Sequence, residues 1–352
     1  MNNELENYLD IIELRKSIKF NTLFLEITNV CNYKCKHCYN LSGEKKALGY
    51  TTDEFSKIIF EFMKYKIKSV ILSGGEALLH TNIWNFIDIL RAENLEVTLL
   101  TNGRLLSNEN AEKLKSKNVN IQISLDGATM QTNDSIRHQG SFSDVISALK
   151  ILKYQNYTNR LSVNTVICNI NYKEIHDIIE LCEEFSVSVV GFNFLNNLGR
   201  AKENELFLSD DELYRTIRNI NKSHNNKNID VKVINVASKC RFCSFDEDLF
   251  LNPVVDVYGN VYMCEFLRDE IFSIGNIFKQ SLEDIMDSEA LKRNLLLFNI
   301  RRYYIHSCRN CAIRDKCSGG CIVQNNNNNY FSPQLCKLIK KNFVNGLEAD
   351  KS

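Results

Sequence analysis

Eleven of the thirteen cysteines fall into two spaced groups, and this spacing is typical of iron-sulfur sites. The first group is Cys31-x3-Cys35-x2-Cys38, which directly follows a short apolar segment. Three thiolates in one short loop can ligate three irons of a cubane 4Fe-4S cluster, and the fourth iron then stays open to a substrate or cofactor. The first group therefore predicts a reactive cluster and not only a structural one.

The second cysteine group lies in the last third of the chain. Its members are Cys240, Cys243, Cys264, Cys308, Cys311, Cys317, Cys321 and Cys336. Together the two groups would hold three clusters. A zinc site stays open as an alternative for the second group, because Cys308-x2-Cys311 is also a common zinc-ribbon half-site. Zinc does not account for the isolated three-cysteine group.

Composition argues against a disulfide scaffold and against several classes of partner. The chain has 352 residues, enough for a large core, and the polar, acidic segment Met1–Asp10 does not predict a secretory leader. We therefore expect reduced thiols in the cytoplasm. The formal net charge is zero, so neither nucleic acid nor an anionic membrane is an expected partner. No apolar run approaches the ~18 to 20 residues of a membrane helix.

Strands and helices are expected to alternate along the first two thirds of the chain, which is the pattern of a parallel sheet. Thr51 and Glu54 have the spacing of a capping box, which predicts a helix that ends near Tyr65. The expected strands are 22–28, 69–72, 96–100, 120–125, 161–167 and 186–194. The other expected helices are 83–92, 142–154, 173–185 and 209–223. Six strand-helix units predict an α/β fold with a partial barrel.

Glycine and polar residues recur directly after the expected strands, where α/β folds place their active sites. The three segments are Ser73-Gly74-Gly75-Glu76, Thr101-Asn102-Gly103 and Ser124-Leu125-Asp126-Gly127. Glycines let the backbone approach a ligand closely, and buried carboxylates can hold a ribose or an amino group. Each segment alone is also a common turn. Their order after a three-cysteine loop predicts one shared site.

On these motifs the sequence resembles the radical S-adenosylmethionine (SAM) enzymes that carry a C-terminal SPASM domain. The resemblance covers roughly residues 20–340 and rests on the three-cysteine loop, on Gly74-Gly75-Glu76, and on the seven-cysteine pattern from Cys243 to Cys336. Ala77 departs from the pattern, because relatives usually have proline there. This change should relax a turn and remove no ligand.

The resemblance implies a fold and a division into domains. Residues 1–20 would form a helical extension, and residues 21–235 a partial (β/α)6, TIM-like barrel. Residues 236–342 would form the SPASM domain with two auxiliary 4Fe-4S clusters, and residues 343–352 a tail.

The resemblance also implies roles for individual residues. Cys31, Cys35 and Cys38 would hold the catalytic cluster, whose open iron chelates the amino and carboxylate groups of SAM. The residues assigned to SAM are Gly74, Gly75 and Glu76 for the methionyl amino group, Ser124 and Asp126 for the ribose, Arg137 for the methionyl carboxylate and Asn164 for the nucleoside. An electron from the cluster would break a carbon-sulfur bond of SAM. The resulting 5'-deoxyadenosyl radical would take a hydrogen atom from the substrate.

The family pattern divides the second cysteine group between two auxiliary clusters. The first would use Cys240, Cys243, Cys264 and Cys321, and the second Cys308, Cys311, Cys317 and Cys336. Four cysteine ligands leave no open iron, which favours electron transfer over substrate binding. Without Cys240, the first auxiliary cluster would keep an open site. Cys168 and Cys182 occupy apolar positions of a strand and a helix and are expected in the core.

Glu265 directly follows the expected ligand Cys264. Relatives that mature sulfatases carry an aspartate at this point and use it as a base. Glu265 could accept a proton from a substrate radical in the same way. The alternative is a solvated surface glutamate.

The resemblance leaves the substrate open between several classes. SPASM domains most often accompany peptide or protein modification, so the first hypothesis is maturation of a ribosomally made peptide through a thioether, carbon-carbon or related bond. Only about twenty residues precede the first expected strand. We therefore expect a separate peptide-recognition protein or a short substrate, and an electron donor such as flavodoxin or ferredoxin. The alternatives are modification of a tetrapyrrole or other small molecule, and sulfatase maturation, which Glu265 disfavours.

A non-catalytic iron-sulfur electron carrier is the alternative outside the enzyme classes. It predicts clusters without SAM cleavage. This reading leaves Gly74-Gly75-Glu76 and the later strand-end motifs without a purpose.

Overall fold

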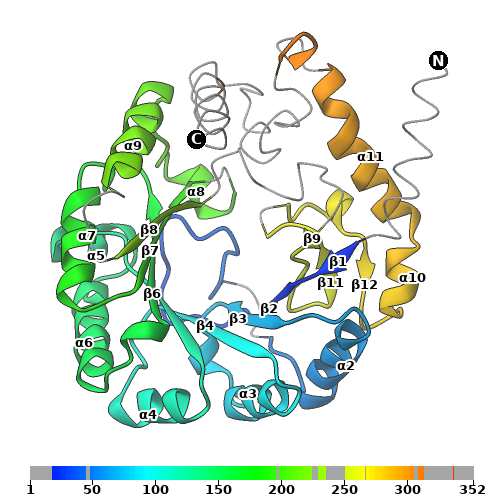
Figure 1. The fold of residues 1–352 in the computed structure, drawn as a ribbon, viewed down its shortest axis with the longest axis horizontal. Coiled ribbons are helices and arrows are strands. Elements are labelled where there is room, and N and C mark those ends of the chain that lie inside the picture. Colours follow the sequence, from blue (N-terminus) through cyan, green and yellow to red (C-terminus); the bar gives the residue numbers. More distant parts are fainter. Residues whose placement is uncertain are drawn as a thin grey trace, which may run out of the picture. The chain divides into compact units, whose positions relative to one another are not determined.

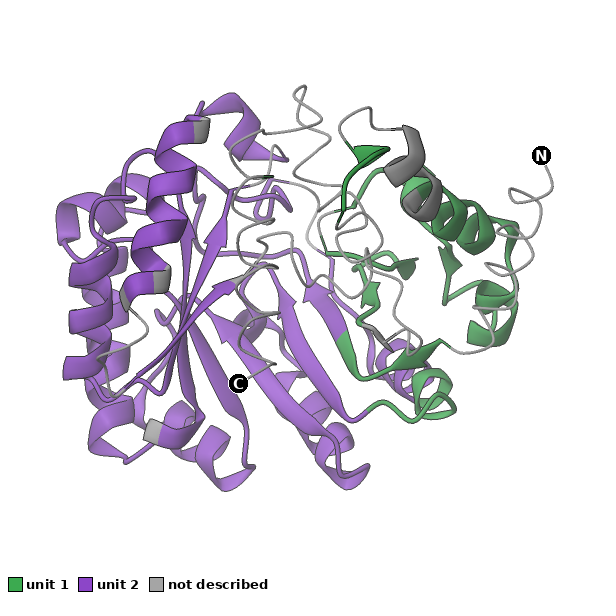
Figure 2. Cartoon of the chain, turned by 45° about the horizontal axis from the view of Figure 1, so that its top comes forward, with its two compact units in different colours: residues 1–23, 60–67, 235–352 green, residues 24–59, 68–234 purple. Residues whose placement is uncertain are grey.

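The computed structural model (Figure 1) describes residues 18–44, 48–195, 198–223, 229–234, 250–265, 267–304, 308–312 and 336. The chain divides into two compact units, which are described separately. Unit 1 comprises residues 1–23, 60–67 and 235–352, and unit 2 comprises residues 24–59 and 68–234 (Figure 2). The three-cysteine loop and all residues assigned to SAM lie in unit 2.

Unit 2 is built on strands that neighbour one another in chain order. They are β2 (Thr22–Thr28), β3 (Ser69–Gly74), β4 (Glu96–Thr101), β5 (Asn120–Ser124), β6 (Leu161–Ile167), β7 (Val189–Phe194) and β8 (Asp230–Ile234). From β3 to β8, each strand runs parallel to the next. This arrangement confirms the predicted parallel sheet and partial barrel.

Helices cover the outer side of this curved sheet (Figure 1). They are α2 (Thr52–Met63), α3 (Ile83–Ala92), α4 (Asn108–Ser116), α5 (Met130–Ile136), α6 (Ser141–Tyr154), α7 (Ile175–Glu184) and α9 (Asp210–Ser223). The short helix α8 (Arg200–Glu203) lies instead against the cysteine loop, where Arg200 N donates to Cys38 O. The predicted capping box begins α2: Thr51 N donates to Glu54 Oε2 at 2.8 Å, and Glu54 N donates to Thr51 Oγ1 at 3.2 Å. Short 3-10 turns lie at Ala77–Leu79, Thr158–Arg160 and Glu270–Phe272.

Alternation along the strands separates an apolar face from a polar one. In β6, Leu161, Val163 and Ile167 are buried, whereas Ser162 and Asn164 on the other face are half-buried. Because successive side chains of a strand point to opposite faces, the first set packs under the helices and the second lines the inside of the barrel. The inner face of β5 and β6 is therefore polar, which suits a ligand site and not a filled core.

Several features of the barrel differ from the sequence expectations, among them the short helices α5 and α8, which were not predicted. The sixth expected strand starts at Val189 and not at residue 186, because Ser186 has a φ of 56° and belongs to the turn that ends α7. The polar helix α4 was not predicted, since Ala111 and Leu114 are its only buried residues. Strand β8 was also missed.

Unit 1 contains short strands and two described helices. Strand β1 (Lys19–Phe20) pairs in parallel with β9 (Phe250–Leu251), and β10 (Val254–Val255), β11 (Asn260–Tyr262) and β12 (Gly275–Asn276) form an antiparallel meander. The helices are α10 (Leu282–Met286) and α11 (Glu289–Tyr304). Among the helices that the structure describes, none has the length and apolar content to cross a membrane.

Candidate cofactor site around the cysteine loop

The three-cysteine loop follows the C-terminal end of β2, and its thiols are half-buried and free of disulfides. Burial raises the pKa of Cys31 to about 11 and that of Cys35 to about 12, and the neighbouring thiols add to both effects. Thiolates at this place therefore need a bound positive centre. Among the described residues, no three His, Cys, Asp or Glu side chains converge on one metal ion. Three thiols in one short loop fit a multi-iron cluster, because in such a cluster each thiolate binds its own iron.

Gly74 and Gly75 let the end of β3 lie against the entry to the cysteine loop. Gly75 N donates to Thr28 O at 2.7 Å, and Glu76 N donates to Val30 O at 2.8 Å. A Cβ atom on Gly74 would lie 2.1 Å from Thr28 O, and one on Gly75 would lie 2.1 Å from Val30 O. Close backbone approach therefore explains both glycines. Their assignment to the methionyl amino group stays a prediction.

The Glu76 carboxylate is 1% exposed and joins the end of β3 to the end of β4. Oε1 accepts from Leu78 N at 3.1 Å and from Thr101 Oγ1 at 2.8 Å, and Oε2 accepts from Asn102 N at 2.8 Å. Burial raises the pKa of Glu76, and these hydrogen bonds oppose that effect. With most acceptor positions used, the side chain mainly fixes the frame of the site.

Asp126 is fully buried and holds a cluster of charged side chains. Its Oδ2 lies 2.6 Å from His37 Nε2 and 2.7 Å from Arg137 Nε, and its Oδ1 accepts from Val166 N at 2.7 Å. Burial acts to raise the pKa of Asp126, but the Arg137 and His37 charges outweigh it and lower that pKa to about 2. His37 precedes Cys38, so Asp126 ties the cysteine loop to the end of β5. These contacts use most acceptor positions of the carboxylate, and the assignment of Asp126 to the ribose stays a prediction.

Arg137 is 7% exposed and lies between Asp126 and the cysteine loop. Its positive charge acts to lower the pKa of the Cys35 thiol. A buried cation at this place is what a carboxylate ligand near the loop would need. The assignment of Arg137 to the methionyl carboxylate stays a prediction.

Ser124 and Asn164 are register partners on the inner faces of β5 and β6. Both are half-buried, and Asn164 Oδ1 accepts from Asn193 Nδ2 of β7 at 2.6 Å. Asn193 Oδ1 is buried and has no hydrogen-bond partner among the described residues. Asn193 thus adds a third polar side chain to this inner face. The only signal for it in the sequence is one polar residue within an apolar strand.

The segment after β7 also contacts the cysteine loop, and sequence reasoning missed it. Arg200 N donates to Cys38 O at 3.1 Å, and Arg200 Nε donates to Cys35 O at 2.8 Å. Arg200 carries no sequence signal, because 165 positions separate it from Cys35 in the chain.

Four of the eight cysteines of the second group can be placed. Cys308 is buried, and Cys264, Cys311 and Cys336 are half-buried; none forms a disulfide. Cys311 N donates to Cys308 O at 3.1 Å, and the same turn occurs in the first group, where Cys38 N donates to Cys35 O at 3.2 Å. The remaining expected ligands lie outside the described residues: Cys240, Cys243, Cys317 and Cys321.

The structure also shows where three residues outside the two cysteine groups lie. Cys168 and Cys182 are fully buried in unit 2, as expected for core residues. Glu265 is half-buried, and its backbone carbonyl accepts from Arg268 Nε at 2.6 Å.

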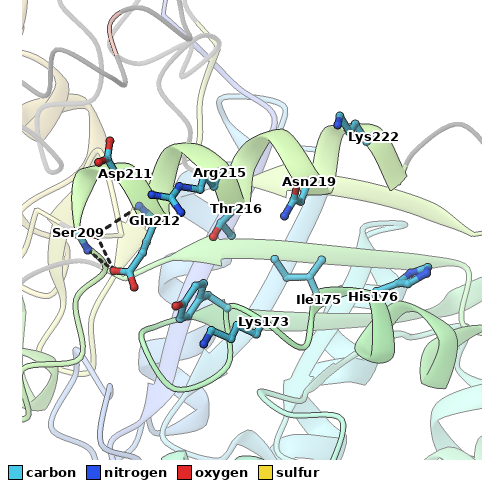
Figure 3. Close-up of a pocket in the computed structure, with 11 residues that line it drawn as sticks. Lys173, Ile175, His176, Ser209, Asp211, Glu212, Arg215, Thr216, Asn219 and Lys222 are labelled. Carbon is cyan, nitrogen blue, oxygen red and sulfur yellow. Dashed lines mark hydrogen bonds between the residues drawn. The ribbon is translucent and has the colours of Figure 1, made fainter.

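A surface cavity of about 820 Å³ lies between α7 and α9 (Figure 3). Its lining includes Lys173, Arg215 and Glu212. The Glu212 carboxylate accepts from Ser209 N and Oγ as part of the cap of α9. None of the residues assigned to SAM or to a cluster lines this cavity. The size of the cavity therefore does not make it the candidate reaction site.

Known proteins share this architecture. The chain is 27% identical over 325 residues to the antilisterial bacteriocin subtilosin biosynthesis protein AlbA of Bacillus subtilis, covering 90% of this chain and 70% of that protein. It is 25% identical over 309 residues to the mycofactocin maturase MftC of Mycolicibacterium smegmatis, covering 85% and 77%. The structure of Streptococcus suis SuiB bound to its precursor peptide SuiA matches with a TM-score of 0.74 at 18% identity, over 95% of this chain and 80% of that chain. At this identity the structural likeness shows the fold alone.

Family profiles match both parts of the chain. The profile of the radical SAM superfamily matches residues 25–182, which contain the three-cysteine loop and the strand-end motifs. The profile of the SPASM iron-sulfur cluster-binding domain matches residues 243–312. The chain therefore belongs to the radical SAM superfamily, and it carries a SPASM domain.

Proposed function

We propose that this protein is a radical SAM enzyme that matures a ribosomally made peptide. The observation that carries the proposal is the cysteine loop at the C-terminal end of β2, framed by Gly74-Gly75-Glu76 and by Asp126. Relatives named for subtilosin and mycofactocin biosynthesis match most of the chain, which supports a peptide substrate over tetrapyrroles or sulfatases. We further propose that it works in the cytoplasm.

In this proposal the cysteines are divided as the family pattern implies. Cys31, Cys35 and Cys38 hold the catalytic cluster. One auxiliary cluster uses Cys240, Cys243, Cys264 and Cys321, and the other uses Cys308, Cys311, Cys317 and Cys336. The reduced catalytic cluster would supply the electron that cleaves bound SAM.

The protein's own residues would bind and shield this cofactor. Arg137 offers a buried positive charge for the methionyl carboxylate, and the backbone beside Gly74 and Gly75 would receive the methionyl amino group. Ser124, Asn164 and Asn193 offer hydrogen bonds to the nucleoside from the inner face of the barrel. The buried side chains of Glu76, Asp126 and Arg137 would help to keep water from the reacting atoms. A separate peptide-recognition protein and a flavodoxin or ferredoxin complete the proposal.

The function is tested with the anaerobically purified full chain, SAM, a strong reductant and any short peptide for which an open reading frame is found beside its gene. We expect 5'-deoxyadenosine to form and the peptide to lose hydrogen by mass spectrometry, with a new cross-link in its fragments. If 5'-deoxyadenosine forms while the peptide stays unchanged, and a tetrapyrrole added instead of the peptide is modified, the tetrapyrrole alternative would replace the peptide proposal. Iron-loaded protein that never cleaves SAM would indicate an electron carrier.

We also propose Glu265 as the base that takes a proton during product formation. Glu265→Gln keeps the shape of the side chain and removes the basic carboxylate. We expect product formation to fall by about a hundredfold, while 5'-deoxyadenosine forms at the normal rate. Chromatography of both products in one reaction measures this. Equal product yield from the variant would rule out Glu265 as this base.

A further inference from the structure

Residues 199–204, here named the clamp segment, close over the backbone of the cysteine loop and include α8. The segment supplies donors to three loop carbonyls: Arg200 N to Cys38 O at 3.1 Å, Arg200 Nε to Cys35 O at 2.8 Å and Asn204 Nδ2 to Lys36 O at 3.2 Å. The cysteine loop lies outside the helices and strands, so its backbone carbonyls need hydrogen-bond donors from other segments or from water. The clamp segment provides them.

Gly199 shows how closely the two segments approach. Its φ of 54° and ψ of −140° place it in a backbone region that favours glycine. A Cβ atom at this position would lie 2.3 Å from Cys38 O and 2.7 Å from Tyr39 O. A larger residue would therefore push the clamp segment away from the last cysteine of the loop.

Arg200 ties together two parts of the loop region from one side chain. It is 8% exposed, and its guanidinium donates to Cys35 O and also pairs with the exposed Glu44 carboxylate further along the chain. A planar guanidinium has several N–H donors and can bind two acceptors on different sides at once, whereas a lysine ammonium is a single point charge. Arg137 is the charged neighbour of the Cys35 thiol, and Arg200 holds the backbone that carries that thiol.

We propose that Arg200 is a positioning residue for the catalytic cluster. By holding the carbonyls of Cys35 and Cys38, it fixes the directions from which two of the three thiolates reach their irons. The inference rests on the proposed assignment of the first cysteine group to that cluster. Arg200 contacts neither substrate nor SAM in this role.

The test compares Arg200→Gln and Arg200→Lys with Arg218→Gln, which removes an exposed arginine of α9. Each full-length chain is purified anaerobically with its clusters, and iron release to a chelator and the electron paramagnetic resonance spectrum of the reduced protein are recorded without substrate. We expect Arg200→Gln to release its catalytic-cluster iron at least about tenfold faster, because a charge-assisted hydrogen bond is lost. Its spectrum should change, Arg200→Lys should lie between, and Arg218→Gln should match the unchanged protein.

Gly199→Ala tests the same contact while Arg200 is kept. The added methyl group should push the clamp segment from Cys38 and give the same spectral change, and this variant decides the question if Arg200→Gln does not fold by circular dichroism. Release rates and spectra equal to those of Arg218→Gln would overturn the proposal. A triple alanine variant of the first cysteine group that keeps all its iron would instead overturn the cluster assignment itself.

Discussion

Alanine at Cys31, Cys35 and Cys38 together is expected to lower the iron content from about twelve to about eight per chain and to abolish SAM cleavage. The change removes all three proposed ligands of the catalytic cluster and leaves the second cysteine group intact. Without the open iron, SAM has no place to receive an electron. Iron and acid-labile sulfide after anaerobic purification measure the first effect, and 5'-deoxyadenosine measures the second.

Cys182→Ala is the matched control for this variant. Cys182 is fully buried in α7, and burial raises the pKa of its thiol strongly, as expected for an inert core cysteine. The control should keep about twelve irons and full SAM cleavage. About four irons in the unchanged protein, or zinc in place of iron, would make the second cysteine group structural. The peptide-modifying proposal would then lose the support that it draws from the second cysteine group.

The parts of the barrel that local patterns govern were predictable from the sequence. The reciprocal bonds of Thr51 and Glu54 that begin α2 depend on residues three positions apart. The apolar strands β2 and β6 have the bounds predicted for them. The polar helix α4 has no comparable pattern, because its cap at Ser107 and two buried side chains are weak signals.

The partners of the site residues were not predictable, because they depend on contacts between distant segments. Asp126 was assigned to a ribose, yet its carboxylate is shared by His37, Arg137 and Val166. A buried carboxylate stays charged only with such compensation, and the sequence does not say which residues supply it. Arg200 meets Cys35 for the same reason: the fold, and not sequence spacing, brings them together.

Asp126→Asn is expected to destabilise unit 2 by about 3 to 5 kcal/mol. The asparagine fits the space but leaves the buried Arg137 guanidinium without its counter-charge, 2.7 Å from the substituted group. The cost is large because the low dielectric of the interior leaves that charge unsolvated. Urea unfolding of the anaerobic protein, followed by circular dichroism, gives the change in the free energy of unfolding.

The effect should depend on pH in one direction. The pKa of Asp126 in the folded protein, about 2, lies below its ordinary value of 3.8, so the folded state favours the charged carboxylate. This contribution is complete above the ordinary pKa and is lost as pH falls through about 2. The stability difference between the unchanged protein and Asp126→Asn should therefore shrink as the solution is acidified through this window.

Asp88→Asn is the control that distinguishes the loss of a buried charge cluster from the loss of an exposed ion pair. Asp88 pairs with Lys117, but its side chain is 56% exposed, so water already solvates both charges. Loss of such a surface pair is expected to cost about 0 to 1 kcal/mol, and high salt should reduce this cost further because it screens the two exposed charges. Equal costs at the two positions would mean that Asp126 is not the electrostatic centre of the cysteine-loop frame. We expect a large cost for Asp126→Asn and a small one for Asp88→Asn. If Arg137→Gln adds little to the cost of Asp126→Asn in a double-mutant cycle, the two residues are coupled, and a buried charge network holds the loop.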